Sequence, residues 1–269
     1  MKIQINGRWY EAKEGEMVLD VLRREGIEVP ALCAHEAVEP YGACRLCMVE
    51  ITHEDWGGWK GNVTSCLYPV EDKLIVHTHT EDVIELRKMV LNLLLARCPN
   101  TPEIQKLAEE YGIDTTSFVP REDADDCIMC GLCTRVCTKM GFNAISVAGR
   151  GYDREVTTPL KEAPPDCVGC LACVNICPTN HIKYQDVGTT REIWGRQFEL
   201  VKCKECGKAL ITREFADYLI ENRDIPADYF DVCHDCKRAG TAKNFKKLVH
   251  WEEKEEAEEE VSACPNDLL

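Results

Sequence analysis

Two cysteine runs repeat within the chain, CIMCGLCTRVC at 127–137 and CVGCLACVNICP at 167–178, each with gaps of two, two and three residues. The first three thiolates of such a run can hold one corner of a cubane cluster, while the fourth, carried away by a helix, reaches the second cluster. Two zinc knuckles are the alternative, but they leave the third gap unexplained. The pattern therefore predicts two [4Fe–4S] clusters. Their ligands would be Cys127, Cys130, Cys133 and Cys177 for the first, and Cys137, Cys167, Cys170 and Cys173 for the second.

Four further cysteines lie near the N-terminus, at Cys33, Cys44, Cys47 and Cys66, with gaps of ten, two and eighteen residues. A C-x2-C pair with one cysteine well before it and one far behind it holds a [2Fe–2S] cluster in plant-type ferredoxins, although the first gap there is four. We therefore expect a [2Fe–2S] cluster at these residues. A zinc site made by the same four thiols is the alternative.

Two C-x2-C pairs follow near the C-terminus, Cys203 with Cys206 and Cys233 with Cys236. Two such pairs separated by an intervening element make a closed S4 site, which is the usual form of structural zinc. A fourth iron–sulfur cluster and a rubredoxin-type iron are the alternatives. Zinc is favoured, because the three-cysteine run seen twice upstream is missing here. Cys98 and Cys264 have no partners in this assignment, and Cys98 is expected to be a small buried residue.

The elements that would position these thiols combine strands and short helices, which predicts an α+β fold. KIQIN (2–6) and RWYEA (8–12) flank Asn6-Gly7 and indicate a β-hairpin, followed by an amphipathic helix at 17–26 and a strand at 74–80. Residues 211–224 indicate another amphipathic helix between the C-terminal cysteine pairs. Gly131 and Gly169 lie where a ligand loop needs permissive backbone angles. The linker at 144–166 is expected to contain a strand, a turn and a proline-rich loop.

Composition narrows the class of protein. The chain has 269 residues, 18 cysteines and a net charge of −15, and the glutamate-rich run at 252–260 indicates a solvated tail. This acidity argues against nucleic acid as a partner. The N-terminus lacks the apolar region of a signal peptide, and the apolar run at 89–96 is far shorter than the roughly 18 residues of a membrane span. We therefore expect a cytoplasmic protein with reduced thiols.

Residues 1–185 resemble the iron–sulfur subunit shared by NADH dehydrogenases, NAD(P)-linked nickel–iron hydrogenases and electron-bifurcating [FeFe]-hydrogenases. GACRLCMVE (42–50) and GRGY (149–152) carry the resemblance, together with the order of the cluster motifs. The resemblance implies a β-grasp [2Fe–2S] domain and a two-cluster ferredoxin-like domain, to which we add a zinc-ribbon-like module. The predicted boundaries are 1–82 for the β-grasp domain, 83–117 for a helical connector, 118–190 for the ferredoxin domain, 191–250 for the C-x2-C module and 251–269 for the acidic tail.

The chain departs from this family in one motif. Relatives often hold a further [4Fe–4S] cluster with one histidine and three cysteines after the first domain. Here that segment (93–114) contains Cys98 alone and no histidine, so this cluster should be absent. We also expect the protein to lack the large catalytic part that some relatives carry.

The sequence contains no G-x-G-x-x-G, P-loop or nucleophile motif, so no substrate-converting active site is recognisable. The resemblance implies an electron-transfer subunit of a hetero-oligomer, located between a flavin-containing NAD(P)H-oxidising subunit and a hydrogenase, a formate dehydrogenase or ferredoxin. The choice between NADH and NADPH, and whether the complex bifurcates electrons, stay open. A free-standing ferredoxin-type carrier with several clusters is the alternative.

Overall fold

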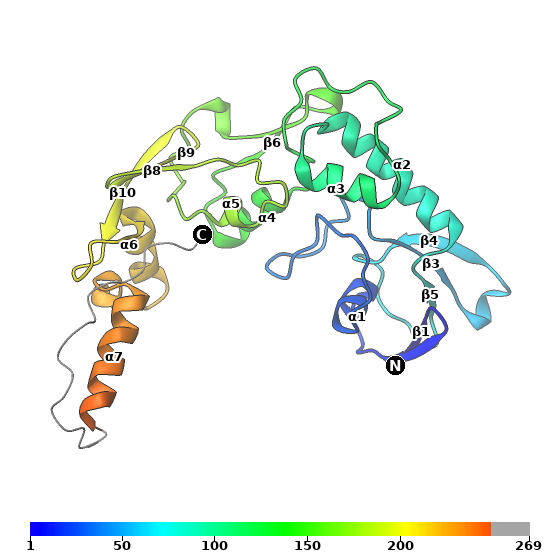
Figure 1. The fold of residues 1–269 in the computed structure, drawn as a ribbon, viewed down its shortest axis with the longest axis horizontal. Helices are drawn as coiled ribbons and strands as arrows, with labels where there is room; N and C mark the ends of the chain where they lie inside the picture. The colour runs from blue at the N-terminus through cyan, green and yellow to red at the C-terminus, as the bar shows by residue number, and fades with distance from the viewer. Residues whose placement is uncertain (249–269) are drawn as a thin grey trace, which may run out of the picture.

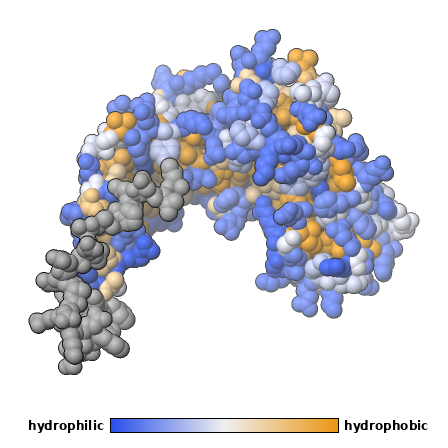
Figure 2. Space-filling view, in the orientation of Figure 1, coloured by the Kyte–Doolittle hydropathy of each residue, from blue (hydrophilic) through white to orange (hydrophobic). Residues whose placement is uncertain are grey.

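The structure, a computed structural model, describes residues 1–248, and their chain forms an arch (Figure 1). The N-terminal domain lies at one end, the paired cysteine runs lie in the middle, and the C-terminal cysteine pairs lie at the other end. The predicted acidic tail and Cys264 lie outside the described residues. Hydrophilic residues cover most of the face seen in Figure 2, with apolar areas between them.

The N-terminal domain is a five-stranded mixed sheet of order β2-β1-β5-β3-β4, with one helix between β2 and β3. The predicted hairpin is confirmed, because Lys2 pairs with Glu11 and Ile5 with Arg8 across the turn at Asn6-Gly7. The described elements are β1 (Lys2–Ile5), β2 (Arg8–Glu11), α1 (Val18–Arg24), β3 (Met48–Thr52), η1 (Glu54–Trp56), β4 (Lys60–Thr64) and β5 (Ile75–His77).

Alternation of apolar residues along β1, β3 and β5 builds the core of this domain, because every second side chain of a strand points to the same face. Ile3, Ile51 and Val76 are almost completely buried there and pack with Val18 and Leu22 of α1. The core therefore holds the helix on one face of the sheet, and the cysteines lie in the loop that leads into β3 and in the segment that follows β4.

Two helices connect the first domain to the middle of the arch: α2 (Glu81–Arg97) and α3 (Pro102–Glu110). Thr80 caps the start of α2 with its hydroxyl, which accepts from the backbone N–H of Val83. The two helices pack against each other, and Leu91 and Ile104 are fully buried in a core that continues into both neighbouring domains. The connector is therefore packed into the fold at both ends.

The middle of the arch carries the two cysteine runs. Each run leads into a short helix, and these two helices pack together. The linker between them forms a hairpin, of which the sequence predicted only the first strand. The described elements are α4 (Leu132–Met140), β6 (Ser146–Ala148), η2 (Gly151–Asp153), β7 (Glu155–Thr157), η3 (Pro159–Lys161) and α5 (Ala172–Asn175).

A four-stranded antiparallel meander, of order β11-β10-β9-β8, leads from the second run to the C-terminal cysteines. Phe198 on β10 is buried against the second run, and Tyr218 on α6 donates to the carbonyl of Met140 at the end of α4 (3.1 Å). The mixed α and β architecture is thus confirmed. The described elements are β8 (Gln185–Val187), β9 (Thr190–Ile193), β10 (Arg196–Lys202), β11 (Ala209–Thr212), α6 (Arg213–Asn222), η4 (Ala227–Phe230) and α7 (His234–Leu248). No helix among these described residues is long and apolar enough to cross a membrane.

Candidate iron–sulfur and metal sites

The four N-terminal cysteines meet at one buried place. Cys33 and Cys44 lie on the loop between α1 and β3, and the backbone N–H of Cys44 donates to Cys33 Sγ (3.4 Å). Cys47 directly precedes β3, and Cys66 follows β4, so the pairing of these two strands brings the second two thiols together. All four are buried. The thiols of Cys44 and Cys66 donate to Cys33 and lower the pKa of the Cys33 thiol.

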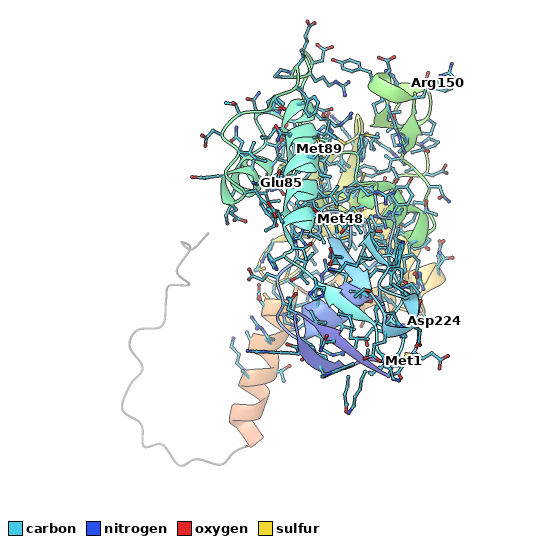
Figure 3. The ribbon with its side chains drawn as sticks, turned by 90° about the vertical axis from the view of Figure 1, so that its right-hand side faces the viewer. Met1, Met48, Glu85, Met89, Arg150 and Asp224 are labelled. Atoms are coloured by element: carbon cyan, nitrogen blue, oxygen red, sulfur yellow. The ribbon has the colours of Figure 1, made fainter. Side chains whose placement is uncertain are left out.

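Two side chains that the sequence pattern did not reveal fix this loop. Ser65 is fully buried, and its hydroxyl donates to the carbonyl of Cys47 (2.8 Å). Arg87 on α2 is also fully buried and donates to the carbonyls of Leu46 (3.1 Å) and Met48 (2.6 Å), on either side of Cys47. In Figure 3, Met48 lies beside α2 below Glu85 and Met89. The helix thus secures the ligand loop through main-chain groups.

The eight cysteines of the two runs line two separate cavities, and each cavity takes three cysteines from one run and one from the other. The first is lined by Cys127, Cys130, Cys133 and Cys177, the second by Cys137, Cys167, Cys170 and Cys173. The crossing arises because Cys137 lies one turn beyond Cys133 on α4, and α5 ends just before Cys177. Burial raises the pKa of the Cys133 and Cys173 thiols to about 12 each, so bound metal would be needed to keep them as thiolates.

Each run uses two left-handed residues to wrap its cavity. Gly131 (φ 70°) and Gly169 (φ 66°) are two of them, as the sequence predicted. The other two are Met129 (φ 55°), which corresponds to Gly169 of the second run, and Leu171 (φ 62°), which corresponds to Gly131 of the first. A side chain at a left-handed position costs about 1–2 kcal/mol. The wrapped loop is therefore maintained against local strain in both runs.

The two glycines should differ in their tolerance of alanine. Both substitutions place a Cβ at a left-handed position, but at Gly169 that Cβ would lie 2.9 Å from Phe198 Cδ2 and 2.9 Å from Thr212 Cγ2, whereas at Gly131 the nearest atom is 3.8 Å away. We expect Gly169→Ala to destabilise the protein by about 1–3 kcal/mol more than Gly131→Ala. Loss of visible cluster absorbance on heating, measured anaerobically, compares the variants. Equal midpoints would contradict the packing argument.

The C-terminal cysteines form a much tighter group. The sulfurs of Cys203, Cys206, Cys233 and Cys236 all lie within 4.8 Å of one another, and in the described part of the chain no other three or more metal-binding side chains gather as closely. Sulfurs arranged tetrahedrally around one ion at about 2.3 Å would lie about 3.8 Å apart, and the Sγ atoms of Cys206 and Cys233 are 3.7 Å apart. The spacing thus fits a single ion.

The backbone around these sulfurs has the form of a metal knuckle. The N–H of Cys233 donates to Cys203 Sγ (3.2 Å), and the N–H of Cys236 donates to Cys233 Sγ (3.3 Å). Gly207 is left-handed (φ 73°), as a tight turn after Cys206 requires. Backbone N–H groups of Cys206 and Cys233 lower the pKa of the Cys203 thiol to about 6. These backbone N–H groups therefore stabilise the thiolate of Cys203, whereas hydrogen bonds with Cys233 and Cys206 raise the pKa of the Cys236 thiol.

Cys98, which the cysteine patterns leave without a partner, is fully buried at the end of α2. Burial raises the pKa of its thiol to about 12. It lines neither of the two cavities. Its burial agrees with the expectation of a small core residue.

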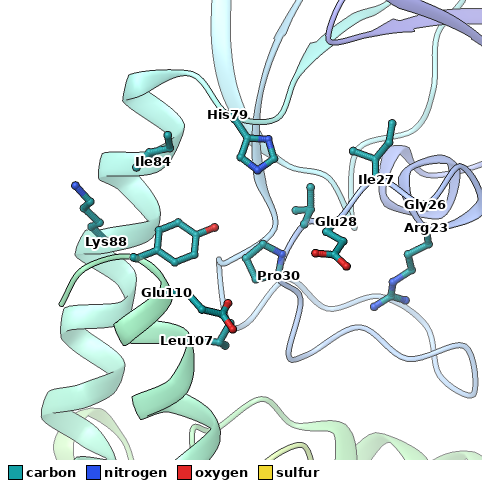
Figure 4. A pocket seen from close by; sticks show the side chains of 12 residues that line it. Arg23, Gly26, Ile27, Glu28, Pro30, His79, Ile84, Lys88, Leu107 and Glu110 are labelled. Carbon is teal, nitrogen blue, oxygen red and sulfur yellow. The ribbon is translucent and has the colours of Figure 1, made fainter. Parts of the chain in front are cut away.

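An open cleft lies between the loop after α1 and the α2–α3 pair, with a volume of about 820 Å³ (Figure 4). Arg23 and Lys88 face it along with Glu28 and Glu110, so its charges balance, and none of its lining residues is a cysteine. The cleft is thus separate from the cysteine sites.

Comparison with known proteins supports the cysteine assignments at the level of domains. Residues 1–81 match the family of 2Fe-2S iron-sulfur cluster binding domains, and residues 121–184 match the family of 4Fe-4S dicluster domains. The C-terminal cysteine pairs lie outside both matches.

Curated relatives that match about two thirds or more of the chain agree with the resemblance found in the sequence. The chain is 30% identical over 210 residues to the NADP-reducing hydrogenase subunit HndD of Solidesulfovibrio fructosivorans (66% of this chain, 35% of that protein). It is 27% identical over 222 residues to the NADH-ubiquinone oxidoreductase 75 kDa subunit of Reclinomonas americana (73% and 31%). The chain spans about a third of the length of these curated relatives.

A chain of the NAD⁺-reducing [NiFe]-hydrogenase in the H2-reduced state has the same fold over 67% of this chain and 85% of its own length, with a TM-score of 0.58 and 24% identity. The fold is thus shared with this hydrogenase chain, and the two domain matches together with the curated relatives confirm the predicted resemblance. The protein contains a 2Fe-2S cluster binding domain followed by a 4Fe-4S dicluster domain, and it is similar to the 75 kDa subunit of NADH-ubiquinone oxidoreductase and to a subunit of an NADP-reducing hydrogenase.

Proposed function

We propose that this chain is the electron-transfer subunit of an NAD(P)H-linked oxidoreductase complex, passing single electrons between a flavoprotein subunit and another redox centre. The observation that supports it most is the pair of cavities, each lined by the crossed cysteine set of a cubane site. Cysteine-ligated clusters carry one electron at potentials set by charge, hydrogen bonds and burial. The N-terminal β-grasp domain would add a [2Fe–2S] cluster at Cys33, Cys44, Cys47 and Cys66.

The packing supports a path along the arch. The apolar core that contains Cys33 and Cys44 also contains Cys130 of the first cubane site, and another core joins Cys133 to Cys137, Cys167 and Cys173. Each predicted cluster site is thus continuous with the next through packed protein. The terminal partner would be a hydrogenase, a formate dehydrogenase or ferredoxin, and the name of one relative, an NADP-reducing hydrogenase subunit, favours a hydrogenase. A cytoplasmic location stays a prediction from the sequence alone.

An anaerobic pull-down of the native protein tests the function. Recovery of a stoichiometric flavoprotein that oxidises NADH or NADPH would support the proposal, and the remaining partner would identify the overall reaction. A brown protein recovered alone, which exchanges electrons with several unrelated enzymes, would instead support the free-standing carrier.

The same proposal assigns one structural zinc ion to Cys203, Cys206, Cys233 and Cys236, because their sulfurs are spaced for one ion. Zinc there would tie α7 to β10 and stabilise the end of the arch. Its role is structural in this assignment, since four protein ligands leave no open coordination position.

We expect ten iron atoms and one zinc ion per chain, because two irons occupy the first site and four occupy each cubane. Cys206→Ser should remove the zinc and leave the iron count unchanged, since Cys206 contributes to neither cavity. Elemental analysis of wild type and variant decides the matter. Fourteen irons without zinc in the wild type, falling in the variant, would mean a fourth cluster.

A further inference from the structure

Arginine side chains contact the backbone of the ligand loops at all three predicted cluster sites, in a chain whose net charge is −15. In these contacts the acceptors are main-chain carbonyls, which do not neutralise the positive charge, although Arg191 also pairs with the carboxylate of Asp186 (2.8 Å). The contacts are those of Arg87 with Leu46 and Met48, Arg97 with Cys127, Arg191 with Gly169 and Arg196 with Cys167. Each of these arginines serves one site.

Arg135, on α4, contacts two sites. Its Nη2 donates to the carbonyl of Cys33 (2.9 Å), in the [2Fe–2S] loop, and to that of Cys130 (3.4 Å), in the first cubane loop. Its Nε donates to the carbonyl of Gly131 (3.1 Å), and Nη1 donates to that of Glu39. In the sequence, Cys33 lies 102 positions from Arg135 and Cys130 lies 5 positions from it. One guanidinium therefore links two ligand loops that belong to different domains.

The geometry explains how one arginine side chain reaches both loops. A guanidinium is planar and carries five donors in a fixed arrangement, so it can bond to several carbonyls at once, which an ammonium group cannot do with the same geometry. The ring of Tyr41 lies 5.3 Å from its central carbon and covers it from one side. Arg135 is half-buried, which reduces the screening of its charge by water. A fixed positive charge favours the reduced, more negative form of a nearby cluster.

We propose that Arg135 is a positioning residue for electron transfer between the [2Fe–2S] site and the first [4Fe–4S] site. It holds the two ligand loops together, and its charge raises the reduction potentials of both clusters. This inference rests on the proposed function. The second [4Fe–4S] site, which Arg135 does not contact, serves as an internal reference.

Reduction potentials measured on the anaerobic holoprotein, by titration monitored with electron paramagnetic resonance (EPR), test the proposal. Arg135→Met should lower the equilibrium constant for one-electron reduction at least threefold at the [2Fe–2S] cluster and at the first [4Fe–4S] cluster, about 28 mV each at 59 mV per tenfold change. The second [4Fe–4S] cluster should shift less than either. Arg97→Met is the matched control. It removes an arginine of α2 that, among the ligand loops, contacts only the first cubane loop, at the carbonyl of Cys127, so it should lower the reduction potential of the first [4Fe–4S] cluster alone.

A second pair of variants separates charge from folding. Arg135→Lys keeps the charge and should leave both potentials near those of the wild type, whereas Arg135→Gln should lower both. If Arg135→Met loses iron, the potentials of Arg135→Lys and Arg135→Gln decide the test instead. Unchanged potentials in Arg135→Gln, or a shift confined to one cluster, would overturn the inference. A wild-type protein with fewer than ten irons and without distinct EPR signals would instead refute the proposed function itself.

Discussion

Alanine at Cys177 should disrupt the same [4Fe–4S] cluster as alanine at Cys127, although the two residues lie in different cysteine runs. The reason is that both line the first cavity, together with Cys130 and Cys133. In the same way, Cys137→Ala should disrupt the cluster that Cys170→Ala disrupts, because those residues line the second cavity. A cubane that loses one of its four thiolates loses iron or changes form, so the effect should be close to complete.

EPR spectra of the reduced variants, with iron content, make the comparison. Cys177→Ala should lose the same signal as Cys127→Ala, and Cys137→Ala the same signal as Cys170→Ala. Cys98→Ala is the control, because Cys98 is buried and lines neither cavity; its iron content and spectra should match the wild type. If Cys177→Ala behaved like Cys170→Ala, each run would hold its own cluster, and the crossed assignment would be wrong.

The cysteines could be predicted from the sequence because their chemistry lies in residue type and spacing. Gaps of two, two and three residues specify both the wrapping loop and the helix that carries the fourth thiol away, and the structure gathers these residues around two cavities. The hairpin around Asn6-Gly7 was predictable for a similar reason, since few residues accept the backbone angles of that turn. Local patterns therefore revealed the sites and the first strands.

The residues that support the sites could not be predicted in this way. Arg87 and Arg135 donate to main-chain carbonyls 41 and 102 positions away in the sequence. Every residue has such a carbonyl, so no sequence pattern marks the ones that accept these hydrogen bonds. Met129 and Leu171 take left-handed angles that sequence reasoning assigns to glycine. Strand β7 was missed because Glu155–Thr157 is short and pairs only with β6. Tertiary contacts, rather than local propensity, decide each of these features.

Among those supporting residues, Arg87 should have the largest effect on stability. Its side chain is fully buried on α2 and donates to the carbonyls of Leu46 and Met48 and to the hydroxyl of Tyr111 (3.3 Å). Arg87→Met would leave these acceptors buried without their donor, at about 1–3 kcal/mol each. Removal of a buried charge offsets part of that cost. We expect a net loss of about 2–4 kcal/mol in the free energy of unfolding.

Thermal unfolding of the anaerobic holoprotein, followed by the [2Fe–2S] absorbance, measures this loss. Arg8→Met is the matched control, because Arg8 lies exposed on β2 and its replacement should change stability by no more than about 0.5 kcal/mol. Arg87→Lys should also be destabilised, since an ammonium cannot span all three acceptors. The [2Fe–2S] signal should fall before the [4Fe–4S] signals, because the two orphaned carbonyls flank Cys47. If Arg87→Met were as stable as Arg8→Met, the helix would not secure the ligand loop through this side chain.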